Sequence, residues 1–125
     1  MASQRKVIPI YTTRGDVGAY LAYPYVFSAI GEWIGWVTPE REVYSVYGSY
    51  VGSLGSGPRI LRKRSDSYGK TSSQIPQPPA NITPPAHVPL PPMMPELPME
   101  IIDVLDEAPD MMPSIDFGEQ HMDLD

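Results

Sequence analysis

Few side chains in this sequence are of types that catalyse reactions or hold metal ions. Cysteine is absent, which removes thiolate nucleophiles, disulfides and cysteine-ligated metal sites. The two histidines, His87 and His121, lie far apart and lack a second ligand at metal-binding spacing. Asp16, Glu32 and Ser49 recur at equivalent positions and could converge in an active site, although turns favour these residue types anyway. We therefore expect no enzyme, no cofactor and no metal site.

Aromatic residues form the second group with chemical potential. Ten of the twelve aromatic side chains fall within residues 11–50. Four of them are candidates for ligand contact, because sugars and bases stack on exposed rings: Trp33, Trp36, Tyr47 and Tyr50. Exposed rings would make this a ligand-binding module for a saccharide or an oligonucleotide. Packing of the same rings in a core is the interpretation we favour, since a small core needs aromatic surface.

The third group is the basic run RILRKR at residues 59–64, in which Arg62, Lys63 and Arg64 are candidates for partner contact. Residues 1–70 carry a net charge of only +4, well short of a strongly basic nucleic-acid domain, so no nucleic acid is expected. A solvated strand end or linker is the favoured interpretation of this run. Loose pairing with the ten acids of residues 71–125 is a further option.

Charge and proline content divide the chain near residue 70. Residues 1–70 hold all nine Lys and Arg, whereas residues 71–125 hold ten acids and no base. Twelve of the sixteen prolines lie between Pro76 and Pro113. Dense proline without aromatic partners is typical of a chain that builds no core. No apolar run reaches the ~18 residues of a membrane-spanning helix, so we expect no membrane contact and a cytoplasmic location.

The elements that would position the aromatic and basic residues are repeated. Apolar pairs begin at intervals of 16, 17 and 17 residues, at Ile10, Val26, Val43 and Ile60. In the first three copies a Gly follows the pair by four residues, and these glycines are Gly15, Gly31 and Gly48. The pair suits a strand, and the Gly supplies the positive φ of a hairpin turn. A second small residue, four positions further on, predicts a bulge or a close backbone approach in the returning strand.

Each copy is therefore predicted to be a short β-hairpin. A lone hairpin is only marginally stable, so about four should pack around a common axis with aromatic rings filling the middle. The fourth copy, ILRKRSDSYGKT, has lost its turn Gly, and either its return at Lys70-Thr71 or the N-terminal KVIPI would close the assembly. The fold class is all-β, a compact closed assembly followed by a disordered, Pro-rich acidic tail.

This organisation resembles a small bacterial family, the four-fold beta flower proteins, in which hairpins of pattern VYxxxGxxxGWV surround a pseudo-four-fold axis. The segments that carry the resemblance are IYTTRGDVGAYL, VFSAIGEWIGWV and VYSVYGSYVGSL, within residues 7–64. The chain departs from the pattern at Gly18-Ala19, which shifts the second Gly, and in the fourth copy. The resemblance implies a fold and supplies no catalytic residues.

The predicted organisation is a hairpin domain at residues 1–64, a Pro-rich linker at 65–98 and an acidic disordered tail at 99–125 with a short helix in it. The linker favours polyproline II, and its PLPP at residues 89–92 could bind a partner's groove. The acidic tail either orders against a partner or only solubilises the chain. We expect a non-catalytic interaction or structural module with a protein partner. Because the core is small, a homodimer would add stability.

Overall fold

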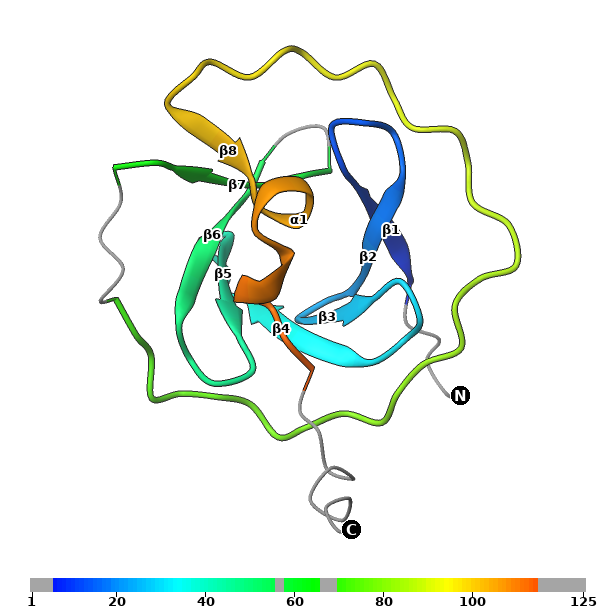
Figure 1. The fold of residues 1–125 in the computed structure, drawn as a ribbon. Helices are drawn as coiled ribbons and strands as arrows, with labels where there is room; N and C mark the ends of the chain where they lie inside the picture. Colours follow the sequence, from blue (N-terminus) through cyan, green and yellow to red (C-terminus); the bar gives the residue numbers. More distant parts are fainter. Residues whose placement is uncertain (1–5, 56–57, 66–69, 115–125) are drawn as a thin grey trace, which may run out of the picture.

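The computed structural model describes residues 6–55, 58–65 and 70–114. Within them, eight strands form one antiparallel sheet in which every strand pairs with its neighbours in sequence. The sheet curls around a central axis as four hairpins, which we call petals 1 to 4 (Figure 1). Their strands are β1 (Ile8–Tyr11) and β2 (Val17–Ala22), β3 (Tyr25–Ser28) and β4 (Trp33–Val37), β5 (Glu42–Ser45) and β6 (Tyr50–Leu54), and β7 (Ile60–Lys63) and β8 (Ile101–Asp103).

The first three petals turn in the same way. Gly15, Gly31 and Gly48 have φ values of 94°, 92° and 85°, and each N–H donates to the carbonyl three residues earlier at 2.9 Å. In each petal the register then shifts by one residue, which is a β-bulge in the returning strand. The predicted hairpins and their turn glycines are confirmed. The predicted close approach is also confirmed, because a Cβ on Gly52 would collide with the carbonyl oxygen of Leu61.

The middle of the assembly is aliphatic, and the prediction of aromatic rings there is wrong. The first residue of each apolar pair points to the axis, and these are Ile10, Val26, Val43 and Ile60, all at most 1% exposed. Successive side chains of a strand point to opposite faces, so the aromatic second residue faces outward. The outward rings form a separate buried cluster that includes Phe27, Trp33, Trp36 and Tyr44.

A long proline-rich segment covers this outward cluster. Residues 70–100, here called the belt, run around the outside of the petals between β7 and β8 (Figure 1). The belt is fastened at the petal tips, where the N–H groups of Ser72 and Ile82 donate to Gly48 and Gly31 carbonyls at 2.8 and 3.0 Å. Proline has no N–H, so such a segment leaves few donors that need partners. The belt gives the sheet a second buried face, which the sequence alone did not indicate.

The fourth petal takes its returning strand from beyond the belt. Leu61, Arg62 and Lys63 of β7 pair with Asp103, Ile102 and Ile101 of β8. The predicted return at Lys70-Thr71 is wrong, because the Lys70 carbonyl instead accepts the N–H of Tyr50 at 3.0 Å beside petal 3. The N-terminal strand does not replace β8 and is the first strand of petal 1.

The segment after β8 enters the centre of the assembly. Helix α1 (Val104–Glu107) and the 3-10 turn η1 (Pro109–Met111) lie over the axis (Figure 1). Ile102, Val104 and Met112 belong to the aliphatic cluster and are at most 8% exposed. The expectation of a disordered tail from residue 99 therefore differs from the structure, which places residues 101–112 in the fold with a short helix. Residues 115–125 lie outside the described residues.

Buried polar bonds join petal 4 to petal 1. The Asp103 carboxylate accepts hydrogen bonds from the backbone N–H and the hydroxyl of Thr13, both at 2.6 Å. The Thr13 hydroxyl also accepts a bond from Nη1 of Arg59 at 3.2 Å. Asp103 and Arg59 are each 1% exposed, and charges so deeply buried need such partners. One backbone bond, from Tyr11 N–H to the Pro58 carbonyl at 2.8 Å, completes the junction.

The belt contact at a turn glycine can be tested with a matched pair of substitutions. Gly31→Ala adds a Cβ that would collide with the Ile82 carbonyl, whereas at Gly15 the nearest belt atom would be 3.6 Å away. Both variants carry the cost of a left-handed alanine, about 1 kcal/mol. We expect Gly31→Ala to destabilise the protein by at least ~1 kcal/mol more than Gly15→Ala in urea unfolding. Gly31→Ala should also speed hydrogen exchange of the Ile82 amide. If the two variants lowered the free energy of unfolding equally, the contact between Gly31 and the belt would be contradicted.

The role of the segment after the belt can be tested by truncating one of its apolar side chains and, as a control, one at the end of the belt. Ile102→Ala should lower the free energy of unfolding by about 2–5 kcal/mol, because Ile102 is 8% exposed in the core. Met99→Ala, three residues earlier and 82% exposed, should change it by less than ~0.5 kcal/mol. A negligible effect of Ile102→Ala in denaturant unfolding would show that this segment lies outside the fold.

Candidate functional site

A cleft of about 580 Å³ lies between β6, β7 and the belt at residues 95–98. This volume is within the ~300–1,000 Å³ of ordinary ligand sites. Its walls combine apolar, hydroxyl and basic side chains, among them Tyr50, Ser53, Arg59, Leu61, Lys63 and Leu97. We call it the petal 3–4 cleft.

The strands and the belt hold the walls of this cleft apart. Ser53 and Leu61 are register partners on β6 and β7, so their side chains lie side by side on the outward face. The belt forms the opposite wall and is held there by a bond from Nη2 of Arg59 to the Pro95 carbonyl at 3.1 Å. Leu97 is half-buried, Arg59 and Arg62 are buried and Lys63 is exposed, so the cleft has mixed apolar and basic walls and a charged mouth.

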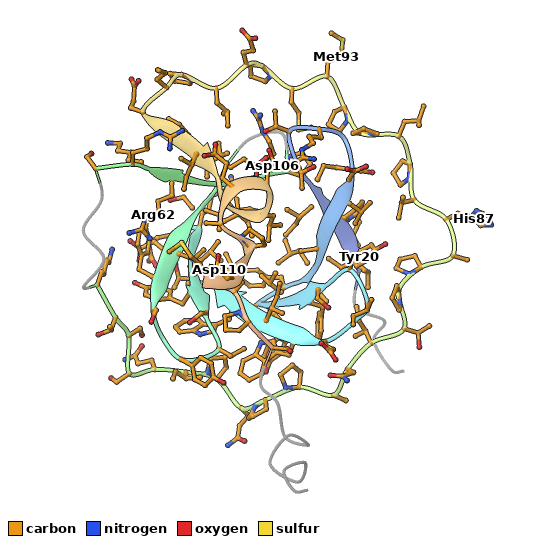
Figure 2. All side chains as sticks on the ribbon, viewed as in Figure 1. Tyr20, Arg62, His87, Met93, Asp106 and Asp110 are labelled. Carbon is orange, nitrogen blue, oxygen red and sulfur yellow. The ribbon has the colours of Figure 1, made fainter. Side chains whose placement is uncertain are left out.

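Two cations lie close to the ring of Tyr50. Nη1 of Arg62 donates to the carbonyls of Tyr50 and Val51 at 3.1 and 3.3 Å, which places its guanidinium carbon 5.5 Å from the centre of the ring. The Lys70 ammonium is 4.8 Å from the same centre. Cations at these distances are attracted to an aromatic face. Figure 2 shows Arg62 on the petal 3 and 4 side, inside the belt.

An ion pair holds the beginning of the belt against petal 3. The Glu42 carboxylate accepts bonds from the Lys70 ammonium at 2.6 Å and from the Tyr44 hydroxyl at 3.0 Å. These two bonds hold the pKa of Glu42 below its ordinary value, and the bond from Lys70 has the larger effect. Burial, followed by the bond to Glu42, raises the pKa of Tyr44. The Glu42 bond also raises the pKa of Lys70.

The structure separates the aromatic candidates. Trp33 and Trp36 are 4% and 7% exposed, and the Trp36 ring stacks on Tyr44 at 4.9 Å, so core packing is confirmed for both tryptophans. Tyr47 is 62% exposed near the tip of petal 3, and Tyr50 lines the cleft. The four rings therefore do not form one exposed platform.

The basic candidates also divide. Arg62 and Lys63 line the cleft with Tyr50, whereas Arg64 donates through Nε to the Met99 carbonyl at 2.6 Å and fastens the end of the belt. Sequence reasoning missed the contributions of Arg59, Ser53 and the belt to the cleft. One signal existed for Ser53, because it occupies the repeat position that holds aromatic residues in the two preceding petals.

The residues considered for catalysis do not meet. Asp16, Glu32 and Ser49 lie at the tips of three different petals, and none of them lines the petal 3–4 cleft. His87 lies on the belt and points away from the petals (Figure 2), and His121 is outside the described residues. The described residues contain no group of three or more acidic or histidine side chains placed to hold a metal ion. Neither α1 nor any other described helix has the length and apolar character needed to span a bilayer.

The later part of the belt has three distinct edges. Pro91, Met94 and Leu97 are half-buried against the petals. Leu90 and Met93, which directly precede Pro91 and Met94, are 89% and 97% exposed. Met93 points away from the petals (Figure 2). The remaining edge is proline throughout: Pro89, Pro92, Pro95 and Pro98. A repeat of three is that of the polyproline II helix. We call Leu90, Met93 and the proline edge beside them the outer belt face.

These features define an all-β protein built from hairpin repeats around an axis. The model of one family, described as 4-fold beta flower protein, matches residues 8–111, from β1 to the end of η1. The chain therefore belongs to the 4-fold beta flower family, and the predicted resemblance is confirmed. No curated protein and no solved structure matches the chain.

The ion pair at Glu42 predicts a pH-dependent contribution to stability. The pKa of Glu42 is lower in the folded state than its ordinary 4.5, so the pair stabilises the protein above that pH. The contribution is lost as the pH falls through the lowered pKa. In urea unfolding from pH 7 to pH 3, Glu42→Gln should be less stable than the wild type near neutrality, and the two should converge below pH 4.5. High salt should shrink the difference, and a gap that does not change with pH would contradict the assignment.

Proposed function

We propose that this protein is a non-catalytic interaction module that presents the outer belt face to a protein partner. The observation that carries this proposal is the exposure of Leu90 and Met93, 89% and 97%, on a segment whose inner edge is anchored. Large apolar side chains at the surface are informative when they line up on one edge. The partner we propose is a domain with an aromatic-lined groove that accepts an extended, proline-rich segment.

Anchoring supports this proposal on energetic grounds. A free proline-rich peptide loses conformational freedom when it binds, at roughly 0.5–1.5 kcal/mol per ordered side chain. Here the Pro89 carbonyl accepts the Tyr11 hydroxyl, and the Pro95 carbonyl accepts Nη2 of Arg59 at 3.1 Å. The belt is thereby held extended on both sides of Leu90 and Met93 before any partner arrives. A partner would meet a preorganised ligand.

The charge of the belt specifies the partner further. Glu96 and Glu100 are exposed, and no basic residue follows Lys70. We infer a groove flanked by basic side chains, because complementary charge steers association. A stacking module for saccharides or oligonucleotides has less support, since Trp33 and Trp36 are buried.

The proposal predicts which substitutions abolish partner binding. Leu90→Ser with Met93→Ser removes the apolar side chains of the outer belt face, while Ile30→Ser removes another exposed apolar side chain, 72% exposed, from the tip of petal 2. All three residues are exposed, so stability should change by less than ~0.5 kcal/mol per site. Photo-crosslinking in an extract of the source cells would identify bound proteins, and each purified partner would be titrated against the three forms of the chain.

We expect a partner with an aromatic groove whose affinity falls at least tenfold in the Leu90→Ser, Met93→Ser variant and is unchanged in Ile30→Ser. A synthetic peptide of residues 86–98 should compete for it, more weakly than the intact protein. Partners that bind both variants alike, or that lack an aromatic groove, would contradict the proposal.

A further inference from the structure

The petal 3–4 cleft lies at the position that a pair of aromatic rings fills in the two preceding petal junctions. Tyr20 of β2 is the register partner of Phe27 of β3, and Trp36 of β4 is that of Tyr44 of β5. All four of these rings are at most 7% exposed in the outward cluster. At the junction of β6 with β7 the corresponding partners are Ser53 and Leu61, neither of which is aromatic.

The absence of aromatic rings at Ser53 and Leu61 accounts for the position of the cleft. The backbone pairing continues from β6 to β7 and the belt still passes outside, so the walls stay in place while the rings between them are missing. What remains is a space beside the Tyr50 ring, bounded by Leu61 and Leu97. A planar apolar group could therefore occupy the place that aromatic side chains fill at the preceding junctions.

The charged groups of the cleft favour an anion on that planar group. Apart from Arg62, whose guanidinium is bonded to carbonyls of petal 3, the lining holds two basic residues, Arg59 and Lys63, and one acidic residue, Glu96. The Arg59 guanidinium donates to two neutral oxygens, those of Thr13 and Pro95, and Asp103 lies one hydrogen bond further on. Lys63 is exposed at the mouth, where it can meet a carboxylate without burying an unpaired charge.

We infer that the petal 3–4 cleft binds a small aromatic molecule that carries a carboxylate, with the ring against Tyr50 and Leu61 and the anion toward Lys63. This site goes beyond the proposed function, because Leu90 and Met93 do not line it, although Pro95 and Pro98 of the proline edge do. A ligand here would fill the gap between petal 3, petal 4 and the belt.

Two naphthalene compounds test the inference on the full chain. Naphthalene-2-carboxylate is the probe, and naphthalene-2-methanol is its neutral counterpart. We expect the carboxylate to bind with a Kd of about 10⁻⁴–10⁻³ M, in the range of a small ligand, and to shift the amide NMR signals of Tyr50, Ser53 and Leu61. The alcohol should bind about three- to fivefold more weakly, because a single exposed ion pair adds little. Lys63→Gln should remove this preference and leave binding of the alcohol unchanged.

A cavity-filling substitution provides the second arm. Ser53→Trp places an indole where Trp36 stands one petal earlier, and it should abolish probe binding while the protein stays folded. Ala80→Trp adds the same ring to an exposed belt position outside the cleft and should leave binding intact. The inference is overturned if the wild type binds neither compound, if it binds both equally, or if the shifts lie elsewhere. The NMR shifts of the wild-type protein locate the binding site by themselves, so the inference can be overturned even if Ser53→Trp fails to fold.

Discussion

Strand β7 needs a partner that its own repeat does not supply, and the rest of the fold depends on how that need is met. An unpaired strand exposes a row of N–H and C=O groups, which invites association with other chains. Strand β8 pairs with β7, and the residues after it, Val104 and Met112, complete the aliphatic centre. Asp103 at the end of β8 then binds Thr13 of petal 1. One three-residue strand thus completes the sheet, the core and the junction between the last petal and the first.

The connection to β8 has a second structural consequence. A sheet with one solvated face shows alternating apolar and polar residues, but all five residues of β4 are buried. Both faces of the sheet are apolar, because the belt covers the outer one and Ile82 packs into its aromatic cluster. The belt carbonyls that meet Gly31 and Gly48 require glycine there for a second reason besides positive φ. The repeat and the belt therefore depend on each other.

The local parts of this architecture could be predicted from the sequence, and the long-range parts could not. Turn glycines and strand pairs act over a few residues, so Gly15, Gly31 and Gly48 identify three hairpins by themselves. The pairing of Leu61 with Asp103 spans the whole belt, and no local pattern indicates it. The sequence pattern predicts a single core with the rings in its middle, whereas the belt provides a second core on the outer face of the sheet. Of the candidate site, Tyr50, Arg62 and Lys63 can be predicted from residue type. The repeat also shows that Ser53 lacks a ring, but only the belt, which covers this junction, turns the missing ring into a cleft.

The loss of the repeat in petal 4 links these observations. Without its turn glycine, β7 has no local return strand, and β8 takes that place after a connection that passes around the other petals. The same divergence put Leu61 where Phe27 and Tyr44 stand in petals 2 and 3, opposite Ser53, so the outward cluster stops at this junction. The belt must nevertheless pass there to reach β8, and it covers a space with no rings inside. The petal that departs from the repeat is for this reason both the point of closure and the position of the cleft.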